Sequence, residues 1–400
     1  MSEWKKVKLG DITRIKTGKL DSNAAVPNGA YPFFTCDPTT LSIDKWAYDT
    51  EAILLAGNNA SGNYTAKYYK GKFNVYQRTY IIETLDPQFA SVRFMAYAMN
   101  QQLQLLKVMS SGSTTKFLTM KMLTQLSINL PSIETQNCIA TILSRYDSLI
   151  ENYQKQIKLL EEAAQRLYKE WFVDLRFPGH ENTKIVNGLP DGWEKKTFGS
   201  VIEYEIGGGW GADTKTSNSI IPAYVIRGTD MSALDMGALK ELPYRFHQES
   251  NYKARQLMHN DIVFEVSGGS KNEGVAKTFL VQQELLDKLD NHVICASFCK
   301  LIRLKDSSTA YYIYDTLKEW RASGITTQYD KRSASSIVNY RWKDFLSQQE
   351  IVIPNEIVLR DYIKKSELIH SSITKKSSQI RLLTEARDRL LPKLMNGEIK

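Results

Sequence analysis

Two stretches of the chain carry apolar residues at helical spacing over an unusual length. In the first stretch, intervals of three and four alternate along the following positions: Ile139, Ile142, Tyr146, Leu149, Tyr153, Gln156, Leu160, Ala163 and Leu167. These intervals are typical of the seam of a coiled coil, here with one polar interruption. Because nothing between Ile139 and Phe172 breaks the pattern, we expect one helix of roughly 50 Å, at about 1.5 Å per residue.

The second stretch repeats this pattern near the end of the chain. Its apolar positions are Ile369, Ile373, Ile380, Leu383 and Leu390, with Lys376 and Arg387 at intervening seam positions. Pro392 is predicted to end or kink this helix. Each stripe needs a partner, and antiparallel pairing of the two helices would relate two halves of the chain by an approximate two-fold axis. The alternative is that each helix packs only on its own domain.

The segments in front of these helices resemble one another. Trp4-Lys-Lys-Val-Lys-Leu-Gly10 returns as Trp193-Glu-Lys-Lys-Thr-Phe-Gly199, and each copy leads to an apolar segment closed by a proline, Pro131 or Pro354. A repeat of this length indicates two copies of one domain. We therefore predict an α+β protein in which two similar domains are joined by two long helices that form an antiparallel coiled coil. The predicted segments are a first domain (1–138), a central helix (139–178), a second domain (179–355) and a distal helix (356–400).

Composition limits the classes of protein that remain. The chain has 400 residues, of which 42% are hydrophobic, enough for two ordinary cores. No stretch approaches the roughly 20 apolar residues that span a membrane, so a cytoplasmic protein is expected. The four cysteines are too few and too unevenly placed for a disulfide framework.

The net charge of +8 is unevenly distributed. Residues 1–138 hold 15 Lys and Arg against 10 Asp and Glu, whereas residues 177–355 hold 21 against 22. Residues 356–400 are again basic, with 10 against 6. The first domain and the distal helix therefore favour a polyanion such as DNA, and the first domain should contribute more of any salt-dependent affinity.

Two helical segments resemble a known family. Leu167-Tyr-Lys-Glu-Trp-Phe-Val-Asp-Leu-Arg-Phe-Pro-Gly179 and Leu382-Leu-Thr-Glu-Ala-Arg-Asp-Arg-Leu-Leu-Pro-Lys-Leu-Met-Asn-Gly-Glu-Ile399 resemble the central and distal conserved regions of the specificity subunits of type I restriction-modification enzymes. Trp193-Glu-Lys-Lys196, after Leu189-Pro-Asp-Gly192, matches the same family. The resemblance covers the whole chain, because both signatures occur in the right order around two segments of domain size.

The resemblance implies a non-catalytic subunit that reads a bipartite, asymmetric double-stranded DNA target with two target recognition domains. Two modification subunits would supply adenine methylation from S-adenosylmethionine, and ATP-driven restriction subunits would complete the nuclease. S-adenosylmethionine, ATP and magnesium are therefore expected in the partner subunits, and no cofactor in this chain. The alternatives are a coiled-coil scaffold that holds two domains without DNA-binding function and, third, an enzyme with an unrecognised site.

The sequence lacks the motifs that mark methyltransferase and nucleotide-binding sites. There is no Pro-Pro, so the Asn/Asp-Pro-Pro-aromatic tetrapeptide of amino-methyltransferases is absent, and no Gly-x-x-x-x-Gly-Lys-Ser/Thr loop is present to hold a triphosphate. The segment His292–Cys299 offers three possible zinc ligands without a second Cys/His pair nearby. Together with Ile294, Phe298, Leu301 and Ile302, it is predicted to be a buried strand without a metal.

Polar loops after two apolar strands are the candidate DNA-reading segments. Gly57–Tyr64 follows Ile53–Ala56, and Ser267–Gly274 follows Ile262–Val266. Such loops bring backbone amides and short side chains to phosphates, while Asn pairs with adenine and Arg or Lys with guanine. The alternative is an ordinary hairpin loop. The candidate contacts, including three cations outside the loops, are Asn58, Asn59, Ser61, Asn63, Arg78, Lys116, Ser267, Ser270, Lys271, Asn272 and Arg332.

Trp171 and Phe172 lie just beyond the first helical seam. They have two interpretations. Either both side chains pack under the second domain, or they form part of a docking surface for a modification subunit, because exposed aromatic residues commonly anchor interfaces. The sequence alone leaves this choice open, and we list both residues as candidate partner contacts.

Overall fold

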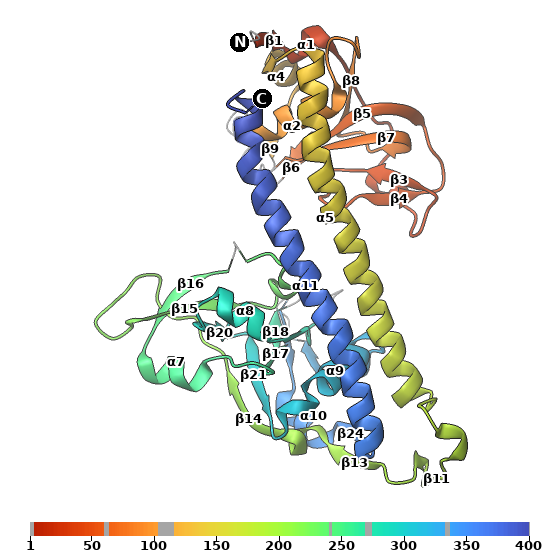
Figure 1. Cartoon of the computed structure of the whole chain (residues 1–400), viewed down its shortest axis with the longest axis vertical. Helices are drawn as coiled ribbons and strands as arrows, with labels where there is room; N and C mark the ends of the chain where they lie inside the picture. Colours follow the sequence, from red (N-terminus) through yellow and green to blue (C-terminus); the bar gives the residue numbers. More distant parts are fainter. Residues whose placement is uncertain are drawn as a thin grey trace. The chain divides into compact units, whose positions relative to one another are not determined.

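The computed structural model describes residues 4–59, 64–102, 116–239, 242–268, 274–332 and 337–399, except for the side chains of Asn59, Lys116 and Arg332. The chain forms two compact units (Figure 1). Unit 1 comprises Met1–Ser148 and Thr384–Lys400, and unit 2 comprises Leu149–Leu383. None of the helices in the described ranges combines the length and the apolar character needed to cross a bilayer.

Unit 1 is built on a six-stranded sheet. The strands in spatial order are β2 (Thr13–Thr17), β8 (Thr79–Thr84), β5 (Tyr48–Ala56), β7 (Ala66–Val75), β3 (Tyr31–Phe34) and β4 (Leu41–Ile43). All neighbours are antiparallel except β3 and β7. The segment Ala52–Ala56 of β5 is buried throughout because this strand lies in the interior of the sheet. Two short ladders complete the unit: β1 (Lys5–Lys8) with β10 (Ser127–Leu130), and β6 (Asn58–Asn59) with β9 (Lys116–Phe117).

Helices cover one face of this sheet. They are α1 (Leu9–Ile12), α2 (Val92–Gln101), α4 (Met120–Gln125) and the first part of α5 (Ile133–Tyr168). The Ser91 side chain caps α2 by accepting from the Phe94 N–H at 3.5 Å. A single core joins Phe94 and Met95 of α2 to Ile53 of the sheet and to Leu143 of α5. Leu394 and Met395, at the end of α11 (Glu356–Met395), belong to the same core.

Unit 2 holds several small sheets. The largest has the order β14 (Ile202–Gly207), β21 (Cys299–Leu304), β17 (Ile262–Glu265) and β19 (Thr278–Leu280). The others are β16 (Tyr244–His247) with β15 (Ile221–Ile226) and β20 (Val293–Cys295); β18 (Ser267–Gly268) with β23 (Val338–Tyr340) and β22 (Asp330–Arg332); β13 (Glu194–Thr197) with β24 (Glu350–Ile353); and β11 (Ile185–Val186) with β12 (Leu189–Pro190). Its shorter helices are α6 (Met231–Asp235), α7 (Glu249–Arg255), α8 (Gln283–Lys288), α9 (Ala310–Ala322) and α10 (Trp342–Gln348).

The two units share a framework, as the repeat predicts. Lys5–Lys8 pairs with Ser127–Leu130 in a four-residue antiparallel ladder, and Glu194–Thr197 pairs with Glu350–Ile353 in the same way. The strand order β2-β8-β5-β7 of unit 1 corresponds to β14-β21-β17-β19 of unit 2, and all neighbours in both series are antiparallel. The predicted similarity of the two domains is therefore confirmed at the level of strand pairing.

A glycine follows the first strand of each framework for the same steric reason. The Gly18 N–H donates to Thr79 O, and the Gly208 N–H donates to Cys299 O. A Cβ atom on Gly18 would lie 2.0 Å from Val75 O, and one on Gly208 would lie 2.2 Å from Cys295 O. No larger residue fits this close backbone approach. The glycine equivalent to Gly18 is thus Gly208.

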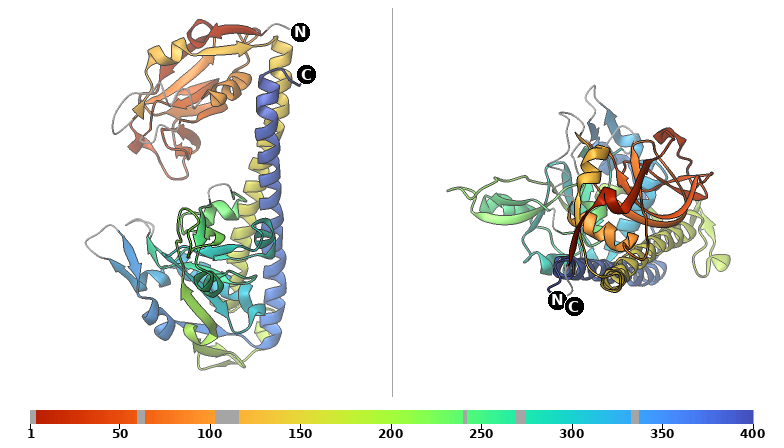
Figure 2. Two further views of the ribbon diagram at one scale, coloured as in Figure 1. Left: turned by 90° about the vertical axis from the view of Figure 1, so that its left-hand side faces the viewer. Right: turned by 90° about the horizontal axis from the view of Figure 1, so that it is seen from above.

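The long helices pair within each unit (Figure 2). In unit 2, the Lys376 Nζ lies 5.6 Å from the Tyr153 ring, and the Tyr168 and Tyr362 rings are 6.2 Å apart. Positions later in α5 therefore meet positions earlier in α11, which is the antiparallel direction. In unit 1, Arg387 Nη1 forms an ion pair of 2.7 Å with Asp147 Oδ1, and the Tyr97 hydroxyl donates to the same carboxylate.

The seam of α5 differs in part from the predicted one. Side chains buried at intervals of seven are Leu143, Ile150, Ile157 and Ala164, whereas the predicted seam residue Leu149 is 46% exposed. Leu149 and Ile150 are adjacent apolar residues, so two frames satisfy the alternating spacing. The observed frame buries Ile157, whereas the predicted frame would have buried Gln156. The predicted α11 positions Ile373 and Ile380 pack in the same cluster as Ile150 and Ile157.

The helix ends also differ from expectation. α5 begins at Ile133, before the predicted start at Ile139, because Ser132 caps it by accepting from the Thr135 N–H at 3.4 Å. α11 does not end at Pro392 but continues to Met395. A proline removes one helical hydrogen bond, and burial of Leu394 and Met395 in the core of unit 1 offsets this loss.

A buried polar cluster joins α9 to α11 inside unit 2. Asp315 is 4% exposed and accepts hydrogen bonds from the Tyr362 hydroxyl at 2.8 Å and the Ser366 hydroxyl at 2.6 Å. Its second oxygen lies 2.8 Å from His370 Nε2. A buried carboxylate with several partners fixes the angular position of a helix, because any other position would leave polar groups without partners. The cluster therefore holds α11 in one orientation against α9.

Candidate nucleic-acid interface

In unit 1 the structure brings four of the predicted DNA contacts together. β6 and β9 pair so that Asn58 lies opposite Phe117 and Asn59 lies opposite Lys116 (Figure 1). The Gly57 N–H donates to the carbonyl of Arg78 at 2.8 Å. Three segments far apart in the sequence therefore meet at one point, which the order of residues alone did not show.

Cys36 links two of these residues. Its thiol lies 2.6 Å from Asn58 Oδ1 and 3.4 Å from the Arg78 carbonyl. Asn58 is half-buried, and the Arg78 side chain is exposed. Within the described ranges, no side chain accepts from the Asn58 Nδ2 or from the Arg78 guanidinium. These two donors are therefore available to a ligand that offers acceptor oxygens or nitrogens.

Lys67 is a nearby cation that is committed to the fold. Its ammonium donates to the carbonyl of Pro38 at 2.6 Å and to the Thr40 hydroxyl at 3.2 Å. Burial lowers the pKa of Lys67, although the charge of Asp37 acts in the opposite direction. The Lys67 ammonium stabilises the turn that follows β3, so it is less available to bind a phosphate than the Arg78 guanidinium.

In unit 2 the equivalent region is a three-stranded ladder. Ser267 of β18 lies opposite Asn339 of β23, and Asn339 lies opposite Lys331 of β22. The Ser267 hydroxyl donates to Asn339 Oδ1 at 2.8 Å. Arg332 is placed in β22 opposite Val338. The structure thus joins two predicted residues, Ser267 and Arg332, through one strand.

Sequence reasoning missed two polar residues of this ladder, Asn339 and Lys331, which are both exposed. The available signal was the alternation in β23, where Val338 and Tyr340 are buried on either side of Asn339. Five predicted contacts lie outside the described residues: Ser61, Asn63, Ser270, Lys271 and Asn272. They stay predictions, as do the roles of Asn59, Lys116 and Arg332, whose backbone positions alone are described.

The segment His292–Cys299 is not one buried strand. It contains β20, a turn and the start of β21, and Phe298 in the turn is 56% exposed. Cys295 and Cys299 are buried, and burial raises the pKa of both thiols, to about 12 for Cys295. Burial therefore disfavours the thiolate form of both side chains. No group of three or more His, Cys, Asp or Glu among the described residues is arranged to hold a metal ion.

The prediction of a docking surface at Trp171 and Phe172 needs correction. Trp171 is 5% exposed and Phe172 is 8% exposed, and both belong to the core of unit 2. The Phe172 ring centroid lies 4.9 Å from that of Tyr312 and 4.7 Å from that of Tyr362. A partner could not reach these rings without opening the core. The structure thus agrees with the other interpretation, in which both side chains pack under the second domain.

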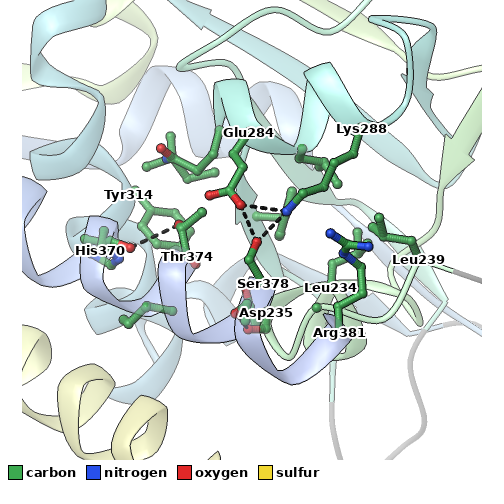
Figure 3. Close-up of a pocket in the computed structure, with 17 residues that line it drawn as sticks. Leu234, Asp235, Leu239, Glu284, Lys288, Tyr314, His370, Thr374, Ser378 and Arg381 are labelled. Carbon is green, nitrogen blue, oxygen red and sulfur yellow. Dashed lines mark hydrogen bonds and ion pairs between the residues drawn. The ribbon is translucent and has the colours of Figure 1, made fainter. Parts of the chain in front are cut away.

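A small cavity in unit 2 lies against α6, α8, α9 and α11 (Figure 3). Lys288 forms an ion pair with Glu284 at 2.6 Å, and Ser378 donates to the same carboxylate. Burial acts to raise the pKa of Glu284, but the bonds from Lys288 and Ser378 outweigh it and lower this pKa. The cavity has a volume of about 80 Å³, below the roughly 300 Å³ of the smallest usual ligand pockets. Its polar groups pair with one another, so we assign no cofactor to it.

Comparison with known proteins shows which family this chain resembles. The family model described as "Type I restriction modification DNA specificity domain" matches residues 1–162. The chain is 33% identical over 224 residues to the Type I restriction enzyme EcoDI specificity subunit of Escherichia coli, an alignment that covers 50% of this chain and 49% of that protein. Residues 1–162 thus match this family, and about half of the chain is similar to a type I restriction enzyme specificity subunit.

Other specificity subunits extend the similarity along the chain. The MjaIX specificity subunit of Methanocaldococcus jannaschii is 29% identical over 310 residues, which cover 74% of this chain and 66% of that protein. The HindI specificity subunit of Haemophilus influenzae is 23% identical, with both chains covered completely. The chain thus aligns with about half of the Escherichia coli relative and with two further relatives over longer spans.

A solved structure of a type I specificity subunit shows the same fold. The crystal structure of the Type-I restriction-modification system S subunit from M. genitalium has a TM-score of 0.60 with this chain at 16% sequence identity. The comparison covers 98% of this chain and 96% of that one. The α+β fold with two similar domains and long helices, which the sequence predicted, is thereby confirmed.

Proposed function

We propose that this chain is the DNA-sequence reader of a type I restriction-modification complex, with one half of a bipartite, asymmetric target read by each unit. The observation that supports this most directly is the pair of matched ladders. β6 with β9 in unit 1, and β18 with β23 in unit 2, each present polar residues at the end of a strand of the shared framework. Asn58 and Ser267 are the residues at these positions.

The chain itself is proposed to carry no chemistry. Two modification subunits would methylate adenine with S-adenosylmethionine, and restriction subunits would use ATP and magnesium. The sequence motifs for methyl transfer and for triphosphate binding, absent from this chain, would belong to those subunits. The specific contribution of this chain is then to place the modification subunits at one DNA sequence among many. α5 and α11 would set the separation of the two half-sites, because each helix contributes residues to both units.

The first prediction separates recognition from chemistry. The purified chain should show no methyltransferase, nuclease or ATPase activity, and methylation should appear when the modification subunit is added. Selection from a library of randomised DNA duplexes by the assembled complex should enrich two short unlike sequences separated by a constant spacer. Radioactive methyl transfer and sequencing of the selected duplexes measure the two effects.

Two results would contradict this proposal. Methylation by the isolated chain at the rate of the complex would place a catalytic site in this subunit. Retention of library duplexes without any enriched sequence would favour a scaffold whose domains do not read DNA. The matched control is the modification subunit alone, which should retain no defined bipartite sequence.

A further inference from the structure

Strand register identifies equivalent positions in the two units independently of sequence similarity. In unit 1, Ala56 of β5 lies opposite Thr79 of β8, and in unit 2, Glu265 of β17 lies opposite Cys299 of β21. The carbonyls of Thr79 and Cys299 each accept from the glycine after the first framework strand, as described above. Thr79 and Cys299 therefore occupy one structural position. The residues immediately before them, Arg78 and Phe298, occupy another.

The carbonyls of Arg78 and Phe298 provide a second marker. The Gly57 N–H donates to Arg78 O at 2.8 Å, and the Val266 N–H donates to Phe298 O at 2.9 Å. Asn58 is thus equivalent to Ser267, because each follows the residue that makes this bond. Their ladder partners are then equivalent as well.

Each unit consequently has three matched positions, here called the reading triplet. In unit 1 the triplet is Asn58, Phe117 and Arg78, and in unit 2 it is Ser267, Asn339 and Phe298. Both triplets contain one asparagine and one phenylalanine, but at different positions.

The side chains of the triplets are available to a ligand. Phe117 is 44% exposed and Phe298 is 56% exposed. A single exposed phenylalanine is unremarkable on a protein surface, but each of these belongs to a triplet that also holds an asparagine. The Asn58 Oδ1 accepts a hydrogen bond from the Cys36 thiol, and the Asn339 Oδ1 accepts one from the Ser267 hydroxyl. Within the described ranges, neither Nδ2 has an acceptor, so each unit has one amide donor without a partner among those residues.

We propose that the reading triplets are the specificity-determining surfaces of the two units, in which asparagine bonds to a base edge and phenylalanine contacts a thymine methyl group. This inference rests on the proposed function and deepens it. The major groove presents acceptors and the thymine methyl at positions that differ for each base pair. Because asparagine and phenylalanine occupy different positions in the two triplets, the two units meet different bases, and the half-sites are unlike in sequence.

The test uses the full chain assembled with its modification subunits and a library of randomised DNA duplexes. Phe298→Ala should relax discrimination by roughly fivefold or more at one or two adjacent positions of one half-site, the magnitude expected for a good base contact. Phe117→Ala should do the same in the other half-site. Phe89→Ala is the matched control, because Phe89 is 40% exposed in unit 1 but lies outside the triplet, and it should retain the wild-type preference at every position.

The salt dependence of DNA binding supplies a second measurement. The logarithm of the binding constant falls as the logarithm of the salt concentration rises. Arg78→Gln should make this negative slope shallower by about one, if the Arg78 guanidinium meets a phosphate. Phe298→Ala should leave this slope unchanged. Thermal unfolding of each variant confirms that exposed positions were altered without loss of the fold.

Each outcome distinguishes the inference from the proposed function. If wild type selects a bipartite sequence and both Phe variants keep its preference at every position, the triplets are not the reading surfaces. If one Phe variant alters both half-sites, the assignment of one triplet to each half-site is wrong. If wild type itself selects no bipartite sequence, the proposed function fails, and the inference that depends on it fails as well.

Discussion

Inserting four residues into α5 between Ser148 and Leu149 is expected to abolish recognition of the wild-type DNA target. The insertion adds about one helical turn, roughly 6 Å. It falls between Asp147, which bonds to Arg387 in unit 1, and Ile150, which packs with Ile373 and Ile380 in unit 2. Since only one of the two paired helices becomes longer, the seams of both units cannot keep their native partners. Binding of the assembled complex to duplexes with altered spacers measures the effect.

A compensated variant is the control for this experiment. Four residues added to α11 between Leu383 and Thr384, together with the insertion in α5, lengthen both helices between the same two units. This variant should recover binding to a target with the same half-sites and a spacer longer by roughly two base pairs, since successive base pairs are about 3.4 Å apart. Unchanged affinity and spacing in the single-insertion variant would contradict a role of the helices in setting the spacer.

Replacing Phe172 with alanine is expected to destabilise unit 2 by about 3–5 kcal/mol, the usual cost of removing a buried aromatic side chain. The ring packs against Tyr312 and Tyr362 and lies 5.8 Å from the ring of Trp193. Its loss leaves a cavity where α5, α9 and α11 meet. Denaturant unfolding of the full chain, followed by tryptophan fluorescence, should show an earlier transition for unit 2, which includes Trp171 and Trp193.

Val173→Ala is a matched control for this prediction. Val173 follows Phe172 in the chain but is 52% exposed, so its replacement should change the free energy of unfolding by less than about 0.5 kcal/mol. The opposite pattern would restore the docking interpretation. In that case Phe172→Ala would unfold like wild type while binding of the modification subunit became weaker.

The repeat and the long helices could be predicted because short-range sequence patterns indicate them. Trp4 and Trp193 begin the two copies, and the first strand after each pairs in the same four-residue ladder. The sequence of α5 alone could not show which of its residues face α11, because Leu149 and Ile150 are adjacent and both apolar. Packing against α11 selects between them. The burial of Trp171 and Phe172 was equally undecided, since a partner surface and a domain core both favour aromatic residues.

The candidate interface was predictable only in part, because it is assembled from distant segments. The polar residues after β5 and β17 mark Asn58 and Ser267, but their strand partners come from 59 and 72 residues later. Phe298 was predicted to be buried because its neighbours are apolar. The structure instead places it in a tight turn between β20 and β21, where its side chain faces solvent. Such a turn cannot be distinguished from a strand by hydrophobicity alone.

Exchange of one domain tests whether each unit reads one half of a bipartite DNA target. Residues 1–130 would be replaced with the corresponding domain of another specificity subunit, and the hybrid would be assembled with the modification subunits for selection from randomised duplexes. We expect one half-site to change to a new sequence while the other half-site and the spacer remain as in wild type. If both half-sites change in the hybrid, or if neither changes, each unit does not read one half-site.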